Sequence, residues 1–180
     1  MTVTDLVVLL DEHGQPTGTA PRTEVHTTDT PLHLAFSCYL RDEAGRVLLT
    51  RRALAKRTWP GVWTNSFCGH PRPGEQMADA VHRYAARELG TTIRDLTCLL
   101  PAFRYRAVDA GGIVENELCP VFVATIDGDL TPDPGEVAEL QWVPADDVRT
   151  LATLAPWSLS PWLVSQVGEL VEHDIWGDVA

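Results

Sequence analysis

Basic residues are scarce in this chain of 180 residues, and the shortage is greatest towards the C-terminus. The sequence has 14 Lys and Arg against 25 Asp and Glu, a formal net charge of −11. From Ile126 onward, Arg149 is the one basic residue. A surface that binds nucleic acid must neutralise phosphates, so this balance argues against a nucleic-acid partner.

Paired cysteines and long apolar runs are also missing. The four cysteines are spaced roughly thirty residues apart without a CxxC pair: Cys38, Cys68, Cys98 and Cys119. Residues 1–10 carry Asp5 and do not have the pattern of a secretory signal. No apolar run approaches the roughly 20 residues that span a bilayer. We therefore expect a cytoplasmic protein with reduced thiols and no membrane partner.

A chain of this length can bury a sizeable core without help from disulfides or a structural metal. Internal repeats, low-complexity tracts and interdomain linkers are not apparent. We predict a single domain over residues 1–180. Any bound metal is then expected to serve function rather than folding.

Hydrophobic periodicity predicts a mixed sheet with helices on its faces, an α/β (α+β) fold. The pattern is typical of strands over residues 6–10, 34–40, 47–50, 99–108, 113–126 and 139–143. Residues 11–18 are rich in turn formers. Helices are predicted over 77–89, stopped by Gly90, then over 145–151 and 159–171, the last with Ser160 as a possible cap.

Cys68 and His70 flank Gly69, and Glu115 and Glu117 follow in a predicted strand. Alternate strand residues share a face, so the two carboxylates point the same way. If that face is internal, they need a cation, or one of them must hold a proton and can act as an acid. The alternative is an exposed acidic strand end.

Two further histidines, His26 and His33, bracket a polar, proline-containing segment that is expected to form a loop. Either alone is more often a surface or core histidine. Together with His70 and the two glutamates, they form a plausible site for Zn²⁺ or Mn²⁺.

Basic residues gather on both sides of Cys68. They are Arg22, Arg51, Arg52, Lys56, Arg57, Arg72 and Arg83. This grouping favours a small anionic substrate, although any one of them is more often a solvated charge.

Residues 69–90 partly match the Nudix box, a loop and helix that present glutamates to metal and diphosphate. The matching positions are Gly69, Glu75, Arg83, Glu88 and Gly90. Tyr84 and Arg87 stand where Nudix hydrolases carry further glutamates. The usual hydrolytic metal cluster is therefore not expected.

Five separated segments appear in order: HTTDTPLHLAF, TWPGVWTNSFCGHP, FRYRA, GIVENELCPVF and PWSLSPW. Together they resemble type I isopentenyl diphosphate isomerase, over roughly Leu6 to Leu163. The resemblance implies a Nudix-like fold with an N-terminal addition. It also implies the conversion of isopentenyl diphosphate to dimethylallyl diphosphate in isoprenoid biosynthesis, through protonation, a tertiary cation and deprotonation.

By this resemblance, Cys68 and Glu117 exchange protons with the substrate and Tyr105 assists at the glutamate. One divalent metal (Mn²⁺, Zn²⁺ or Mg²⁺) is expected on the ligands His26, His33, His70, Glu115 and Glu117. Mg²⁺ is expected to arrive with the diphosphate, on Glu88 and the Cys68 carbonyl. The substrate contacts implied are Arg22, Arg52, Lys56 and Trp162.

Two departures stand out. Arg22 replaces a common Lys, and Tyr84 replaces a second Arg. We expect weaker diphosphate affinity or a shifted diphosphate, with activity retained. The alternatives are an isomerase or cyclase acting on a longer prenyl diphosphate, a Nudix hydrolase, and a noncatalytic metal-binding or scaffold protein. A monomer or weak homodimer is expected.

Overall fold

Two mixed sheets form the frame of the molecule. The computed structural model describes residues 5–179. Residues 1–4 and 180 of the predicted domain lie outside the described part. Within it, no helix has the length and apolarity to cross a membrane. The five-stranded sheet has the order β2 (Pro16–Pro21), β1 (Leu6–Leu10), β3 (His33–Leu34), β10 (Val114–Leu118) and β9 (Arg104–Val108).

The seven-stranded sheet carries the core of the protein. Its main order is β12 (Val137–Pro144), β5 (Arg46–Arg52), β4 (Phe36–Arg41), β11 (Val121–Ile126) and β8 (Ile93–Leu100). Two short strands join it at one end: β6 (Trp63–Thr64) pairs with β5, and β7 (Phe67–Gly69) pairs with β4.

The chain crosses between the sheets three times, and here the sequence prediction was wrong. The single strands predicted over 99–108 and 113–126 are each two strands, broken at residues 101–103 and at Cys119–Pro120. Ala35 separates β3 from β4 in the same way. Proline cannot donate a ladder hydrogen bond, which explains the break at Pro120. The backbone pairing resumes at once, since Ser37 N donates to Pro120 O at 3.0 Å.

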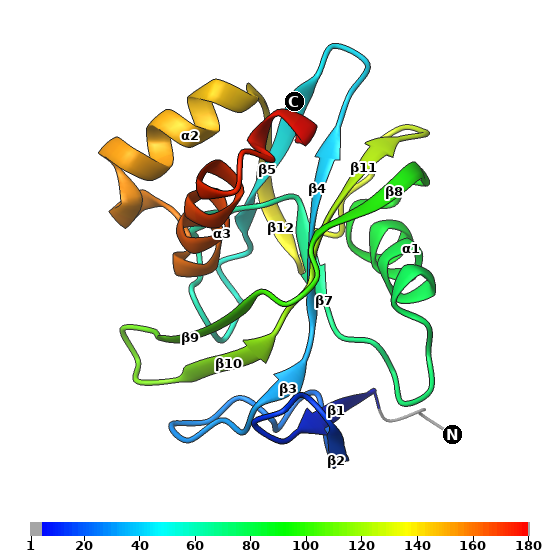
Figure 1. Cartoon of the computed structure of the whole chain (residues 1–180), viewed down its shortest axis with the longest axis vertical. Helices are drawn as coiled ribbons and strands as arrows, with labels where there is room; N and C mark the ends of the chain where they lie inside the picture. The colour runs from blue at the N-terminus through cyan, green and yellow to red at the C-terminus, as the bar shows by residue number, and fades with distance from the viewer. Residues whose placement is uncertain (1–4, 180) are drawn as a thin grey trace.

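Helices cover both faces of the larger sheet. In Figure 1, α1 (Met77–Leu89) lies on one side, and α2 (Ala145–Leu154) and α3 (Pro161–Glu172) lie on the other. Short 3₁₀ turns, η1 (Pro156–Ser158) and η2 (Trp176–Asp178), flank α3. Two predicted helix signals are confirmed: Gly90 adopts a left-handed φ of 61°, and the Ser160 side chain accepts a hydrogen bond from Leu163 N. The second predicted helix, 145–151, extends further, to Leu154.

Alternation along β4 divides the core in two. Cys38 and Leu40 pack towards α1, while Tyr39 packs towards α2 and α3. Residues 11–18 were predicted to be turn-rich, but only part of this segment is a turn, because β2 begins at Pro16 and pairs with β1. The boundary between the sheets brings β7, β10 and α3 together, and the candidate site lies there.

Candidate functional site

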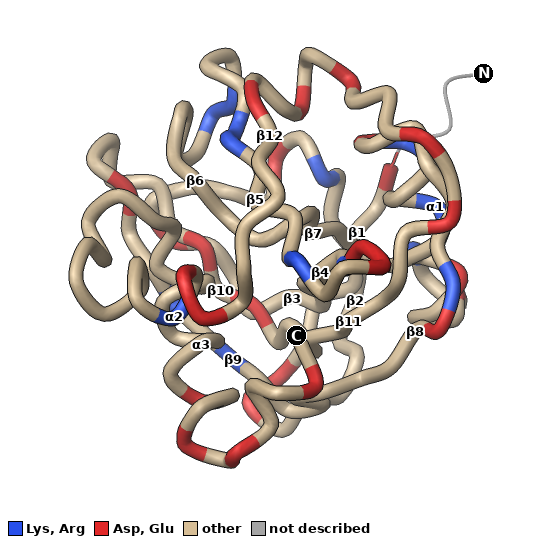
Figure 2. Tube along the Cα trace, turned by 90° about the horizontal axis from the view of Figure 1, so that it is seen from above, with Lys and Arg blue, Asp and Glu red and all other residues tan. Residues whose placement is uncertain are grey.

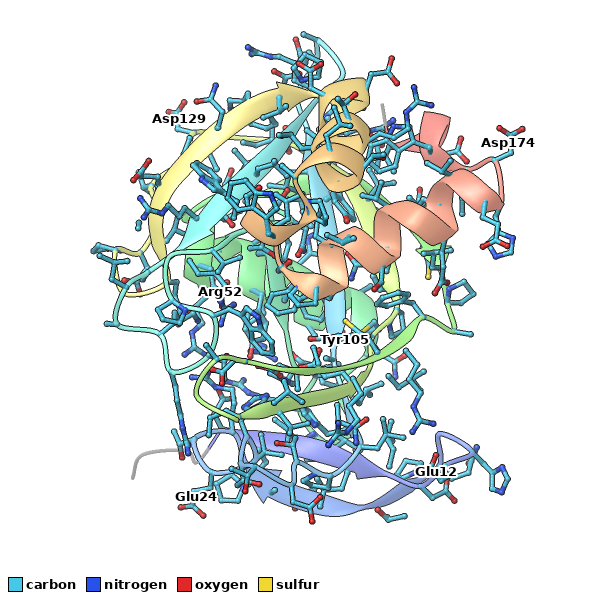
Figure 3. All side chains as sticks on the ribbon, turned by 90° about the vertical axis from the view of Figure 1, so that its left-hand side faces the viewer. Glu12, Glu24, Arg52, Tyr105, Asp129 and Asp174 are labelled. Atoms are coloured by element: carbon cyan, nitrogen blue, oxygen red, sulfur yellow. The ribbon has the colours of Figure 1, made fainter. Side chains whose placement is uncertain are left out.

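One cleft of about 310 Å³ contains nearly all the predicted site residues. Those lining it are Arg22, His26, Arg52, Lys56, Cys68, His70, Glu88, Tyr105, Glu115, Glu117 and Trp162. His33 is not among the lining residues and is fully buried. Figure 3 shows Arg52 and Tyr105 within the body of the molecule, whereas Glu12, Glu24, Asp129 and Asp174 lie at its periphery.

Three histidines and one glutamate converge at one side of the cleft. Ligand atoms of His26, His33, His70 and Glu117 all lie within 4.8 Å of one another. Glu117 Oε1 lies 3.1 Å from His70 Nε2 and 3.4 Å from His33 Nε2. The three imidazole rings lie 5.1 to 5.7 Å apart. Three nitrogens and a carboxylate form a donor set suited to Zn²⁺ or Mn²⁺.

The orientation of the rings fits a metal. Nε2 of His26 and of His33 is buried without a hydrogen bond, although each faces a carboxylate. His33 Nδ1 lies 3.0 Å from Pro31 O, an arrangement that fixes the proton on Nδ1 and leaves the lone pair on Nε2. Unpaired imidazole nitrogens that converge on a carboxylate are what a divalent ion would satisfy.

Glu115 lies at the edge of this group. Its Oε2 contacts His26 Nε2 at 2.8 Å, and its Oε1 accepts a hydrogen bond from Thr58 Oγ1 at 3.0 Å. Asn116 between the glutamates turns away and donates to Thr30 O, so the predicted alternation is confirmed. Burial opposes a charge on His26, but Glu115 and Glu117 outweigh it and raise the pKa of His26 to about 9.

Tyr105 and Glu117 form a direct pair. Tyr105 OH donates to Glu117 Oε2 at 2.9 Å across the hairpin of β9 and β10. Burial by itself would raise the pKa of Glu117, but His26, His33 and His70 hold it well below its usual value. Burial raises the pKa of Tyr105 well above its usual range, so the phenol keeps its proton. Glu117 is therefore a carboxylate with a phenolic donor on one oxygen.

Cys68 faces the cleft from β7, a strand of the other sheet. Its sulfur lies 3.3 Å from Ser37 Oγ and 3.3 Å from Asn65 Nδ2. Burial raises the pKa of Cys68 to about 12, against the opposing effect of the Ser37 and Asn65 contacts. At neutral pH this residue is a thiol, which suits a proton donor better than a nucleophile.

Aromatic rings line part of the same cleft, where Tyr105 and Trp162 both lie. Trp162 lies 5.7 Å from the Tyr105 ring and 5.3 Å from the Trp59 ring. Its indole Nε1 donates to Asn65 Oδ1 at 3.0 Å, which fixes the ring plane. The guanidinium of Arg52 lies 5.4 Å from the Trp162 ring centre, so a cation already occupies one position against this ring.

The predicted basic cluster divides into two sets. Arg22, Arg52, Lys56 and Arg57 line the cleft. Arg51, Arg72 and Arg83 are not among the lining residues and form ion pairs with Glu139, Asp5 and Glu75. Figure 2 shows Lys and Arg near β5 and β12 and along α1, while acidic residues are spread around the outline. The cleft therefore has a cationic rim on an acidic protein.

The rim cations are held in place by the protein. Arg22 Nε contacts Asp5 at 3.1 Å, Arg52 donates twice to Thr58 O, and Lys56 pairs with Glu136. Beside them, burial raises the pKa of Glu88 to about 7 despite the opposing charges of Lys56 and Arg52. A carboxylate in this state gains from a nearby cation.

Tyr84, the departure noted in the sequence, is a core residue that borders the cleft. Its ring is 1% exposed and lies 5.5 Å from the Phe36 ring, under the Gly69 backbone. The guanidinium groups of Arg83 and Arg87 lie 4.7 and 5.7 Å from the ring centre. Its hydroxyl is buried without a hydrogen-bond partner.

Sequence reasoning missed four polar residues around the reactive groups. Thr58 and Asn65 stood within the TWPGVWTNSFCGHP segment, and that position was the available signal. Ser37 carried none. Gln166 did carry a signal, because this polar residue interrupts the buried apolar stripe of α3.

Comparison with known proteins agrees with this arrangement. Residues 31–163 match the NUDIX domain model. A relative named isopentenyl-diphosphate Delta-isomerase from Frankia alni is 62% identical over 165 residues, which cover 92% of this chain and 85% of the relative. The chain belongs to the isopentenyl-diphosphate Delta-isomerase family.

Other members of that family match over similar lengths. Relatives with the same name from Kocuria rhizophila and Paenarthrobacter aurescens are 60% and 55% identical, over 91% and 96% of this chain and 91% and 94% of their own. A solved structure from Deinococcus radiodurans has a TM-score of 0.68 at 18% identity, covering 91% of this chain and 98% of the other. This structural likeness shows a shared fold, and the match of residues 31–163 to the domain model identifies it as the Nudix fold.

Proposed function

We propose that this protein isomerises isopentenyl diphosphate to dimethylallyl diphosphate, in isoprenoid biosynthesis, with divalent metals bound. The observation that carries the proposal is one small cleft that holds Cys68, the Tyr105–Glu117 pair and a cationic rim. The family name of the relatives supports the same reaction.

The rim suits the diphosphate end of the substrate. Arg22, Arg52 and Lys56 supply positive charge, and Arg52 presents a planar fork that matches phosphate oxygens. Glu88 lies beside them and would hold Mg²⁺ with the diphosphate, helped by the Cys68 carbonyl. Magnesium usually keeps waters and phosphate oxygens as ligands, so one protein carboxylate suffices.

Cys68 and Glu117 would carry the protons. They reach the cleft from strands of different sheets, β7 and β10. In one direction, the Cys68 S–H proton moves to the terminal alkene carbon, whose π electrons form the new C–H bond. A carboxylate oxygen of Glu117 then takes a proton from C2, and that C–H pair becomes the new double bond. Microscopic reversibility exchanges the two roles in the reverse direction.

Trp162 would stabilise the intermediate. The tertiary cation is favoured by the electron-rich face of an indole, and Asn65 holds that indole in place. Tyr105 donates to Oε2 of Glu117 and so helps to orient this carboxylate, whose Oε1 faces His33 and His70. The aromatic wall also excludes water, which would otherwise capture the cation.

A divalent metal on His26, His33, His70 and Glu117, with Glu115 alongside, would supply positive charge that holds Glu117 ionised and orients it. Mn²⁺, Zn²⁺ and Mg²⁺ are the candidates. Thr58, through its hydrogen bond to Glu115, would orient that carboxylate from behind.

The cleft volume bears on the alternative of a longer prenyl diphosphate. About 310 Å³ is at the lower end of the roughly 300–1,000 Å³ range of ligand pockets, which favours a five-carbon substrate. A Nudix hydrolase is disfavoured because Tyr84 and Arg87 contribute no carboxylates. We further propose a cytoplasmic monomer or weak homodimer without nucleic-acid or membrane partners.

The proposal is tested by offering the purified protein isopentenyl diphosphate, geranyl diphosphate and nucleoside diphosphates separately, with Mg²⁺. Product is followed by NMR, and phosphate and pyrophosphate release by a coupled assay. The expected result is an allylic five-carbon product without phosphate release. Release from a nucleotide, or turnover of the longer substrate alone, would contradict it.

A further inference from the structure

A polar side chain lies in the middle of the core beneath Cys68. Gln166 belongs to the buried face of α3 and is fully buried among apolar neighbours. A carboxamide in such a place is destabilising unless its hydrogen bonds are made. Tyr39 OH donates to Gln166 Oε1 at 2.9 Å, and Gln166 Nε2 donates to Ser37 Oγ at 2.8 Å. Both ends of the amide are therefore satisfied.

These contacts have a direction that ends at the sulfurs of Cys68 and Cys119. The Tyr39 hydroxyl donates to the amide oxygen, so the amide nitrogen must face Ser37. Ser37 Oγ accepts from that nitrogen, and its single hydrogen is left for another acceptor. Two sulfurs are within reach: Cys68 Sγ at 3.3 Å and Cys119 Sγ at 3.4 Å.

Asn65 occupies the other side of the same sulfur. Its Nδ2 donates to Cys38 O and Phe67 O at 3.1 and 2.8 Å and also lies 3.3 Å from Cys68 Sγ. Its Oδ1 already accepts from Trp162 and Thr64 and lies 3.4 Å from Cys68 Sγ. When Ser37 donates to Cys68 Sγ, the Cys68 S–H is left with Asn65 Oδ1, a shared acceptor 3.4 Å away, among the described residues.

We propose that Ser37 is a positioning residue for the reaction: its hydroxyl, oriented by Gln166 and Tyr39, donates to Cys68 Sγ and stabilises the sulfur as its proton leaves. This rests on the proposed role of Cys68. When the proton moves to the alkene, the sulfur keeps the S–H electron pair as a thiolate and Ser37 keeps its own proton. A hydrogen bond to a charged acceptor is stronger than one to a neutral thiol, so the contact favours the transition state.

The test uses two substitutions that interrupt the series of hydrogen bonds from Tyr39 to Cys68 at different points. Ser37→Ala removes the donor, and Gln166→Met removes the group that orients it. Because Ser37 is fully buried and does not line the cleft, substrate binding should not change. Ser37→Ala is expected to lower kcat about 10- to 100-fold with KM within about twofold. Gln166→Met should lower kcat by a smaller factor.

A purely structural role is separated by a control and a second measurement. Val148→Ala removes two buried methyl groups from the same core on α2, so it also lowers the melting temperature but should leave kcat unchanged. Alkylation of Cys68, measured by peptide mass spectrometry relative to the exposed Cys98 at one mildly alkaline pH, reports the Ser37 contact without turnover. That ratio should fall in Ser37→Ala and Gln166→Met but not in Val148→Ala.

The proposal is overturned if folded Ser37→Ala and Gln166→Met proteins keep both the wild-type kcat and the wild-type alkylation ratio. An equal loss of kcat in Val148→Ala would also overturn it. If Ser37→Ala does not fold, Gln166→Met decides. If the wild type does not isomerise isopentenyl diphosphate, the proposed function fails; if Cys68→Ala keeps the activity, the proposed role of Cys68 fails. In both cases the alkylation ratio still shows whether Ser37 donates to this sulfur.

Discussion

Gly69 gives the sharpest prediction about the active-site backbone, because it lies between Cys68 and His70 and directly over a buried ring. A Cβ built at this position would lie 2.6 Å from Cγ, Cδ1 and Cδ2 of Tyr84. Ordinary contact begins at 3.4 Å, so the strand or the ring must move by about 0.8 Å. The Tyr84 ring is fully enclosed and packs on Phe36, which leaves β7 as the part that shifts.

Gly69→Ala is therefore expected to displace both the thiol and the imidazole on either side of it. Overpacking of this kind costs about 1–3 kcal/mol of stability. A shift near 1 Å in a reacting group costs on the order of 100-fold in rate. We expect kcat/KM for isopentenyl diphosphate to fall by about that factor while the protein stays folded. Urea unfolding and steady-state kinetics on the same sample measure the two effects.

A second substitution tests the cause. If the ring is the obstacle, Tyr84→Ala should restore part of the activity lost in Gly69→Ala, whereas Tyr84→Phe, which keeps the ring, should not. The coupling is read from the double-mutant cycle. Full activity of Gly69→Ala, or equal rescue by both Tyr84 substitutions, would refute the steric reasoning.

Three further predictions concern stability, metal and diphosphate. Arg83 holds the pKa of Glu75 below its usual value. The ionised Glu75 therefore stabilises the folded protein fully above about pH 4.3, the pKa of an unfolded-state Glu, and this contribution is lost as the pH falls through the folded-state pKa. The gap in unfolding free energy between wild type and Glu75→Gln should close on acidification, and a constant gap would contradict this. Adding Zn²⁺ or Mn²⁺ at about 100 times its Kd should stabilise chelator-treated wild type by about 2.7 kcal/mol and should not stabilise His33→Ala. Equal shifts in the melting curves of the wild type and this variant would count against the site. Tyr84→Arg should bind magnesium pyrophosphate about 3- to 10-fold more tightly by calorimetry while melting lower, since it gains a charged donor and loses the ring; equal affinity would reject the predicted deficit.

Much of the fold followed from local sequence signals. Helix α1 was predicted to the residue because an apolar stripe ends at Gly90, and the Ser160 cap marked the start of α3. The two-sheet arrangement was not predictable in this way. Residues 113–126 were predicted as one strand. Pro120 marks the break, but the division between the two sheets comes from the pairing of β10 with β3 and of β11 with β4.

The site shows the same division between local and long-range information. Alternation placed Glu115 and Glu117 on one face, and the structure buries both. The remaining assignments depended on resemblance, since nothing in the spacing of His26 and His70 shows that their rings lie 5.7 Å apart. The contact of Ser37 with Cys68 joins residues 31 positions apart and needed the pairing of β4 with β7.

The most direct test of the central claim is a reaction in D₂O. Purified, metal-loaded protein is incubated with Mg²⁺ and isopentenyl diphosphate, and the product is followed by NMR alongside Cys68→Ala and Glu117→Gln. The account predicts deuterated dimethylallyl diphosphate from the wild type and none from either variant. Absence of turnover by folded wild type, or turnover that survives both substitutions, would contradict it.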